Sequence, residues 1–329
     1  MTQTPSQMPA KGDPRIRIAL CIFACLAIVP PLLSLVGLDY YTSVVTRMMI
    51  YAIAALSLDL ILGYGALVSF GHAAFFGIGA YAALFLQTRG ITDFFLHLAG
   101  ASLAATAFAL VTGAIALRTR GVYFIMISLA FGQMAFFFFI SLSAFGGDDG
   151  MSLSRATLFG QELLRSEVTL FYLVLVILVV IFGFLCRLTR SRFGRVLIGT
   201  REDSLRMEAI GYRIMPYQMA AYVISAVICA IAGVLIANQL QYVSPTLSSW
   251  QRSGEFIIMV VLGGVGNLVG ALAGALLTIG LEEALARFSE HWKLWFGMLL
   301  LAVVLFSPGG LTRLVERVSG RITGKGDDR

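Results

Sequence analysis

Few side chains in the long apolar stretches of this chain could carry out acid–base, nucleophilic or metal chemistry. The three histidines, His72, His97 and His291, are too few and too scattered for a haem pair or for an H-E-x-x-H metal site. The four cysteines lie in or beside apolar stretches, where isolated thiols pack as small apolar groups. Because no acid pair and no nucleophile with its base is visible either, the sequence predicts no catalytic residue, no metal and no cofactor.

Two ionisable residues, Arg47 and Asp59, lie inside apolar stretches, where charges are expensive and usually functional. They are 12 positions apart, about 18 Å along a helix, so they cannot pair directly. We expect Arg47 to extend to the outer surface of the membrane, and Asp59 to cap a helix or meet loop water. Two charges are too few to favour proton or sodium coupling within this chain.

ATP binding by this chain alone is not expected. The only Gly-Lys pair, Gly324-Lys325, lacks the preceding Gly-x-x-x-x spacing of a phosphate loop. The longest hydrophilic stretch, 187–215, is too short for a separate soluble domain. Energy for active transport would therefore come from an ion gradient or from another subunit.

Membrane-spanning helices must position these residues. Of the 329 residues, 58% are hydrophobic and 13% charged, with a mean hydropathy of +0.87. A soluble domain carries about 25% charged residues, so this composition excludes a water-soluble globular protein. A helix of roughly 20 apolar residues crosses a bilayer. Nine stretches reach or approach that length: 18–38, 44–62, 66–86, 94–117, 121–145, 168–186, 216–240, 256–281 and a shorter 294–307.

The positions of Lys and Arg predict the orientation of these spans. With the N-terminus inside, the Arg-rich segment 187–215 falls inside and the more acidic segment 146–167 falls outside. The basic tail 308–329 returns inside only if 256–281 is interrupted, and glycines within 263–267 favour such a break. We therefore expect an all-α polytopic membrane protein of about eight to ten transmembrane helices, with a broken or re-entrant segment near 263–267.

Segment 187–215 carries seven arginines against three acids, interleaved with apolar residues, and Gly211 offers a helix stop. This pattern predicts one or two short amphipathic helices along the membrane face. The segment could be a basic loop that sets topology, or a docking helix for a cytoplasmic partner. Candidate residues for docking are Arg195, Arg201, Glu202, Asp203, Arg206, Glu208 and Gly211.

Six segments follow one another in a recognisable order: Ser57–Tyr81, Thr119–Phe124, Gly146–Gly150, Gly194–Gly211, Leu262–Asn267 and Phe306–Leu311. Together they resemble the permease subunits of ATP-binding-cassette importers for branched-chain amino acids, specifically the longer of the two paired permeases. The resemblance covers about residues 45–312.

The resemblance implies a division of labour among subunits. This chain would pair with a second, shorter permease, while two cytoplasmic ATPases would bind below and an extracytoplasmic solute-binding protein would deliver substrate. A permease helix would sit in a groove of the ATPase, a role that falls on Arg195 through Gly211. Glu208-Ala209 followed by Gly211 is similar to the Glu-Ala-Ala loop of such importers, but the second Ala is absent and the glycine spacing is shorter. Membrane lipid is a further partner, and no nucleic acid is expected.

A path for a zwitterion with an apolar side chain needs weak, mostly neutral contacts. Polar residues in otherwise apolar spans are candidates to line it: Ser69, His72, Ser128, Gln133, Asn238 and Gln239. Each alone is better explained as an interhelical hydrogen bond, typically worth about 0.6 kcal/mol, so the hypothesis concerns the group. Small residues should pack helices closely, with Gly266, Gly270 and Gly274 repeating every four positions and Gly77 in a weaker stripe.

We therefore expect a transport permease without catalysis of its own in the bacterial inner (cytoplasmic) membrane. Residues 1–17 and 308–329 would be cytoplasmic tails, and 18–307 a single transmembrane domain. Alternatives are a similar permease for urea, short amides or aromatic acids, and an ion-gradient-driven carrier. A membrane-embedded enzyme is disfavoured by the missing catalytic groups.

Overall fold

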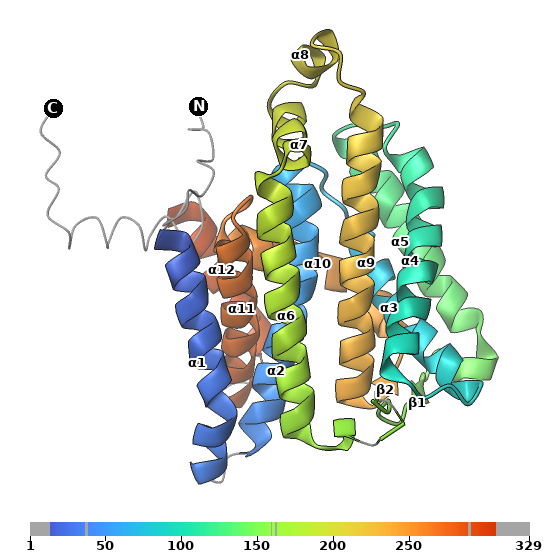
Figure 1. The fold of residues 1–329 in the computed structure, drawn as a ribbon, viewed down its shortest axis with the longest axis vertical. Coiled ribbons are helices and arrows are strands. Elements are labelled where there is room, and N and C mark those ends of the chain that lie inside the picture. The colour runs from blue at the N-terminus through green and yellow to red at the C-terminus, as the bar shows by residue number, and fades with distance from the viewer. Residues whose placement is uncertain (1–13, 37–38, 159, 162, 289–290, 307–329) are drawn as a thin grey trace, which may run out of the picture.

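The computed structural model describes residues 14–36, 39–158, 160–161, 163–288 and 291–306. In this part of the chain the fold is a bundle of apolar helices (Figure 1). Two short helices, α7 (Arg192–Glu202) and α8 (Ser204–Ala209), project from one end, which we call the loop end. The antiparallel pair β1 (Met151–Ser152) and β2 (Tyr242–Val243) lies at the opposite end, which we call the strand end.

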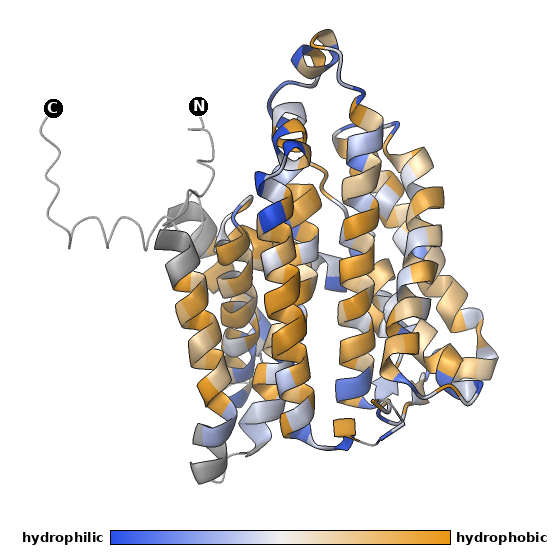
Figure 2. Cartoon of the chain, viewed as in Figure 1, coloured by the Kyte–Doolittle hydropathy of each residue, from blue (hydrophilic) through white to orange (hydrophobic). Residues whose placement is uncertain are grey.

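The long helices of the bundle alternate in direction between the two ends. They are α1 (Pro14–Val36), α2 (Asp39–Asp59), α3 (His72–Thr88), α4 (Phe94–Ala116), α5 (Val122–Ser141), α6 (Glu167–Arg190), α9 (Ile214–Leu240), α10 (Trp250–Gly263), α11 (Leu268–Phe288) and α12 (Trp292–Phe306). A π-helical turn, Leu60–Tyr64, extends α2. Six helices of the described residues are long and apolar enough to cross a membrane, and apolar residues cover the bundle (Figure 2). The expected all-α polytopic fold is confirmed.

The predicted interruption near 263–267 is present, because α10 ends at Gly263 and α11 begins at Leu268. A second interruption was not predicted. The expected span 66–86 is wrong at its start, since residues 65–71 are irregular and α3 begins only at His72. With 17 and 14 residues, α3 and α10 are both shorter than the roughly 20 residues that cross a bilayer.

These two short helices meet in the interior of the bundle. The Ser253 hydroxyl of α10 accepts a hydrogen bond of 2.9 Å from the backbone N–H of Ala73, in the first turn of α3. From this contact α3 runs to the strand end and α10 toward the loop end. The chain reaches α3 through residues 65–71, and it reaches α10 through β2 and a 3₁₀ turn, Pro245–Ser248.

Helix α9 lies at the centre of the bundle, packed against α2, α3 and α4. The buried face of α4 is a stripe of small residues: Ala101, Ala105, Ala109 and Gly113. Such a stripe lets helix backbones approach closely, which supplies much of the packing energy between helices in a bilayer. The arrangement is repeated in the second half of the chain, where α10 and α11 pack against α2 as α3 and α4 pack against α9.

Three details of the expected spans are corrected. Helix α11 continues seven residues past the expected end at position 281, to Phe288, so Glu283 is helical. The guanidinium of Arg47, for which no partner was expected, pairs with Glu283 at 3.1 Å. Gly266 precedes α11 and has a φ of +79°, so only Gly270 and Gly274 of the expected stripe lie on that helix.

The expected cytoplasmic tails lie mostly outside the described residues. Residues 1–13 and 307–329 are not described, and α1 already begins at Pro14, inside the expected tail 1–17.

Candidate functional site

A group of buried polar side chains surrounds the first turn of α3. His72 Nε2 lies 2.9 Å from the Ser57 hydroxyl of α2 and 3.5 Å from the Ser225 hydroxyl of α9. Ser225 in turn donates a 2.5 Å hydrogen bond to the backbone carbonyl of Ser57. All three side chains are fully buried. This group therefore ties the start of α3 to both long neighbouring helices.

Irregular backbone inside a bilayer must be covered by protein or line a water-filled cavity. The segment before α3 meets this requirement through serine hydroxyls. Phe70 donates its backbone N–H to Ser128 of α5 at 3.1 Å, and Ala73 donates to Ser253 as described above. Ser128 and Ser253 thus support the backbone of this segment.

The other predicted path residues are dispersed. Asn238 accepts the backbone N–H of Ala156 at 2.8 Å near the strand end, and Gln239 donates to the carbonyl of Ser43 at 2.5 Å. Ser69 is fully buried, and Gln133 is half-buried on α5. The structure brings Ser69, His72 and Ser128 together around the start of α3, but it leaves Asn238 bonded to an irregular segment at the strand end and Gln239 bonded to α2.

Sequence reasoning missed two charged residues in the bundle, Arg252 and Glu255 of α10. Arg252 Nη1 and Glu255 Oε2 are 2.6 Å apart, and the guanidinium lies 5.7 Å from the centre of the Tyr51 ring. The apolar run begins only at Phe256, so the pair was taken to precede a span. Its spacing of three residues, which places both side chains on one helix face, was the available signal.

A junction of three elements lies toward the loop end. Asp59, fully buried, accepts the backbone N–H of Gly266 at 2.8 Å, so of its two expected roles, capping or contact with loop water, it caps a backbone group at the break between α10 and α11. Arg201 of α7 donates to the backbone carbonyl of Gly63, in the π-helical turn. A Cβ on Gly63 would come within 2.6 Å of the Gly266 Cα, so only glycine fits there. The projecting loop, the end of α2 and the break in α10–α11 are therefore in direct contact.

The projecting loop forms the two helices that the sequence predicted, with Asp203 between them. Asp203 accepts the backbone N–H of Arg206 at 3.0 Å and caps α8, while Gly211, with a φ of +98°, follows its end. Arg195, Glu202, Arg206 and Glu208 are exposed, and Glu208 pairs with Arg120 of the α4–α5 turn at 3.5 Å. Of the predicted docking residues, Arg201 is the one directed into the bundle.

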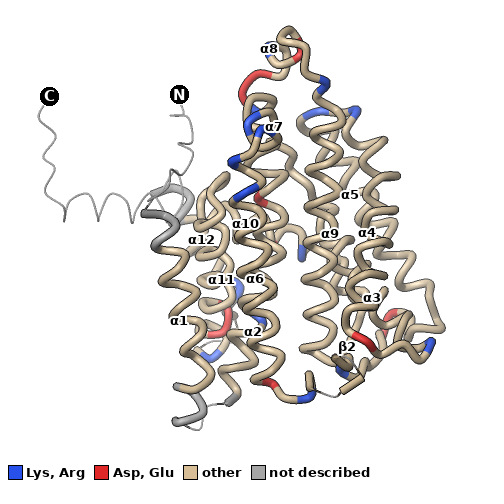
Figure 3. The backbone as a smooth tube through the Cα atoms, viewed as in Figure 1, with Lys and Arg blue, Asp and Glu red and all other residues tan. Residues whose placement is uncertain are grey.

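The tip of this loop exposes apolar side chains beside its charges. Leu205 is 72% exposed and Ile210 is 65% exposed. Both acidic and basic residues lie on and beside α8 at the loop end (Figure 3). Large apolar side chains exposed within a charged rim are typical of a protein–protein contact.

Glycines hold neighbouring helices at close distance. Gly270 and Gly274 of α11 lie against the Gly263 end of α10, and Gly77 of α3 lies against Ser248. A Cβ at any of the three would collide with the opposing element.

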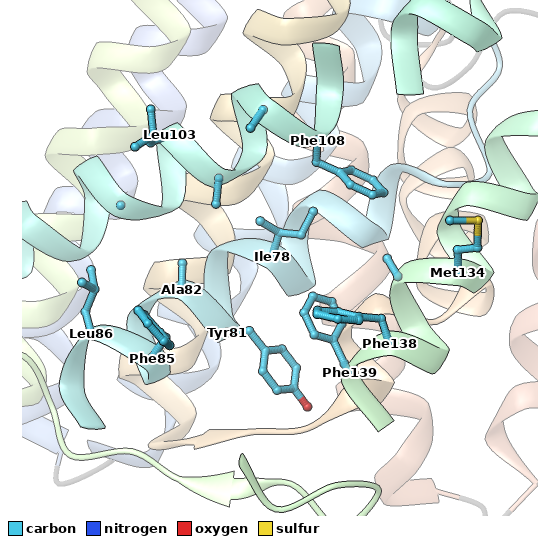
Figure 4. Close-up of a pocket in the computed structure, with 14 residues that line it drawn as sticks. Ile78, Tyr81, Ala82, Phe85, Leu86, Leu103, Phe108, Met134, Phe138 and Phe139 are labelled. Atoms are coloured by element: carbon cyan, nitrogen blue, oxygen red, sulfur yellow. The ribbon is translucent and has the colours of Figure 1, made fainter. Parts of the chain in front are cut away.

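An apolar cavity of about 810 Å³ lies between α3, α4 and α5 (Figure 4). Side chains of the three helices project toward one another around it, among them Tyr81, Leu103, Phe108, Met134 and Phe138. It offers almost no polar surface, so it suits an acyl chain or an apolar helix and not a charged solute.

The fold and these sites are those of a multi-pass membrane permease, in which irregular segments interrupt apolar helices inside the bilayer. More specifically, the chain belongs to the family described as branched-chain amino acid transport system / permease component, whose model matches residues 40–307.

Curated relatives agree with this family. The high-affinity branched-chain amino acid transport system permease protein LivM of Salmonella typhimurium is 29% identical over 92% of this chain and 77% of its own length. The LivM protein of Escherichia coli is 30% identical over 82% of this chain and 69% of its own length. LivH of Salmonella typhimurium, a permease protein of the same named system, is 27% identical over 82% of this chain and 93% of its own length. No solved structure matches the chain.

Proposed function

We propose that this chain is a permease subunit of an ATP-binding-cassette importer and forms half of the translocation path for branched-chain amino acids. The observation that carries the proposal is the family match over residues 40–307, together with relatives named as branched-chain amino acid permeases. Its similarity to both LivM and LivH suits a path built from two related chains.

Energy enters from separate ATPase subunits. The chain has no phosphate-loop sequence, and Leu205 and Ile210 at the tip of α8 provide an apolar contact for a protein partner. An ATPase seated there would act on the α10–α11 break through Arg201, Gly63 and Gly266. A second permease, two ATPases and an extracytoplasmic solute-binding protein complete the importer, and the chain performs no catalysis itself.

The location is the inner membrane of a bacterium, with the loop end and both termini in the cytoplasm. Seven arginines lie between positions 187 and 215, and short basic segments stay on the cytoplasmic side of membranes. The strand end then faces outward, where a binding protein delivers substrate.

The test is ATP-dependent uptake by the complete complex in proteoliposomes. The panel is leucine, isoleucine, valine, urea and benzoate, each with ATP and with a non-hydrolysable analogue. Uptake of the three amino acids that requires ATP is the expected result. Transport of only urea or benzoate would contradict the substrate, and uptake driven by an ion gradient without ATPases would contradict the importer.

A further inference from the structure

The ion pair Arg252–Glu255 lies at the middle of the bundle. Arg252 is adjacent to Tyr51, the thirteenth of the 26 residues from Asp39 to Tyr64, so about 18 Å of helix separates it from the start of α2. The next residue, Ser253, contacts the first turn of α3, which also lies in the bundle interior. A bilayer core is about 30 Å thick, so the pair is near its centre.

The pair is on the surface of this chain. The side chains of Arg252 and Glu255 are 31% and 39% exposed, and their neighbour Trp250 is 47% exposed. Gly254, between the two charges, has open space where a side chain would be. This face of α10 is therefore not covered by any described part of the chain.

Contact with lipid hydrocarbon would be energetically unfavourable for this face of α10. Charged side chains near the bilayer centre face the interior of an assembly or a water-filled cavity, because lipid exposure is costly. From the middle of the bilayer neither side chain can reach a membrane surface about 15 Å away. The exposed face of α10 must therefore line the solute path, or it must lie at the contact with a second permease subunit that covers this face.

We propose that Arg252 and Glu255 form a transit site for a zwitterionic amino acid, with the solute carboxylate on Arg252 and its ammonium group on Glu255. This inference rests on the proposed function, since it assigns the carboxylate and ammonium groups of the proposed amino-acid substrates to Arg252 and Glu255. An α-amino acid carries a carboxylate and an ammonium group close together. The pair presents the two complementary charges, the Arg252 guanidinium and the Glu255 carboxylate, close together as well.

The existing ion pair keeps the affinity of the site for its solute low, as transport requires. A solute that enters exchanges one internal ion pair for two contacts of its own, and the internal pair closes again behind it. The pair itself has no net charge when it is empty, and the pair with a bound zwitterion has none either. A cationic or anionic solute would leave one unit of charge uncompensated.

The test uses the complete complex in proteoliposomes, with leucine uptake, ATP hydrolysis and subunit assembly measured together. Arg252→Gln and Glu255→Gln should each assemble and hydrolyse ATP while leucine uptake falls about tenfold or more, since a hydrogen bond to a charged group is lost. Arg155→Gln is the control, because it breaks an ion pair with Glu167 that lies away from α10, and it should keep uptake per assembled complex. Uptake at the wild-type rate in both Gln variants would overturn the proposal.

The exchanged double variant Arg252→Glu/Glu255→Arg decides the result if the single variants do not assemble. It keeps an ion pair at the same spacing but reverses its direction relative to the Tyr51 ring. Restored assembly without restored uptake supports a solute site. Restored uptake, or failure of this variant also to assemble, would assign the pair to folding and overturn the proposal. If wild-type complex imports no branched-chain amino acid, the proposed function fails instead, independently of the variants.

Discussion

Asp59 illustrates how a carboxylate is accommodated inside an apolar bundle. Its Oδ1 atom accepts the backbone N–H of Gly266, 207 residues further along the chain, at the point where α10 and α11 are interrupted. Backbone groups at such a break have no helical partner and no lipid partner. The side chain thus serves as a cap supplied by another helix, which explains a buried acid without invoking ion coupling.

Substitutions of Asp59 separate these two roles. Asp59→Ala leaves Gly266 without its acceptor and should destabilise the protein by about 1.5–3 kcal/mol, whereas Asp59→Asn keeps an oxygen acceptor and should retain most stability and uptake. Thermal unfolding of the purified complex and leucine uptake are the measurements. Complete loss of uptake in a stable Asp59→Asn complex would instead indicate that the charge itself is required.

At the scale of elements, α7 is the connection between the projecting loop and the bundle. Arg201 contacts the Gly63 carbonyl, and Gly63 packs against the backbone of Gly266. A displacement of α7 therefore reaches the α10–α11 break through two successive contacts.

Arg201→Gln should weaken that connection while leaving docking intact. We expect the ATPase subunits to remain bound and to hydrolyse ATP, with fewer amino acids imported per ATP. Arg192→Gln, on the same helix but exposed and outside the predicted docking residues, is the control and should keep the wild-type ratio. Equal ratios in both variants would contradict a coupling role for Arg201.

The exposed tip of α8 should determine ATPase binding. Replacing both Leu205 and Ile210 by serine removes the apolar contact from a solvent-exposed loop, so the permease should still fold but retain less ATPase on co-purification. Leu205→Met, which keeps an apolar side chain, should bind normally. Undiminished retention in the double serine variant would place the docking surface elsewhere.

The helices themselves could be predicted from the sequence because apolar length and glycine position are local signals. The break at 263–267 was predicted from its glycines, and the two loop helices from the pattern of 187–215. The late start of α3 could not be predicted, since residues 66–86 carry no Asp, Glu, Lys or Arg and are mostly apolar, and the irregular part depends on the hydroxyls of Ser128 and Ser253. Arg252 was missed for the same reason: its depth follows from tertiary packing against Tyr51.

At the scale of the whole molecule, the two ends of the bundle differ in charge and in shape. The loop end carries α7, α8 and many arginines, and the strand end carries the β1–β2 pair (Figures 1 and 3). The proposed orientation assigns these ends to opposite sides of the membrane.

Cysteine labelling in intact cells tests this orientation. In a variant without native cysteines, Asp149→Cys near the strand end should react with a membrane-impermeant maleimide added outside. Ala209→Cys, exposed on α8, should react only after the cells are opened. The reverse pattern would invert the proposed topology.

The meeting of α3 and α10 also has a consequence for biosynthesis. Ala73 and Ser253 are 180 residues apart, so the N–H of Ala73 is made long before its acceptor. At typical rates of synthesis of about 5–20 residues per second, the delay is roughly 10 to 40 s. During that time the backbone N–H of Ala73 lacks this partner, and an unpaired backbone group is costly in contact with lipid. We therefore expect the start of α3 to remain out of contact with lipid during insertion until the ribosome has delivered α10.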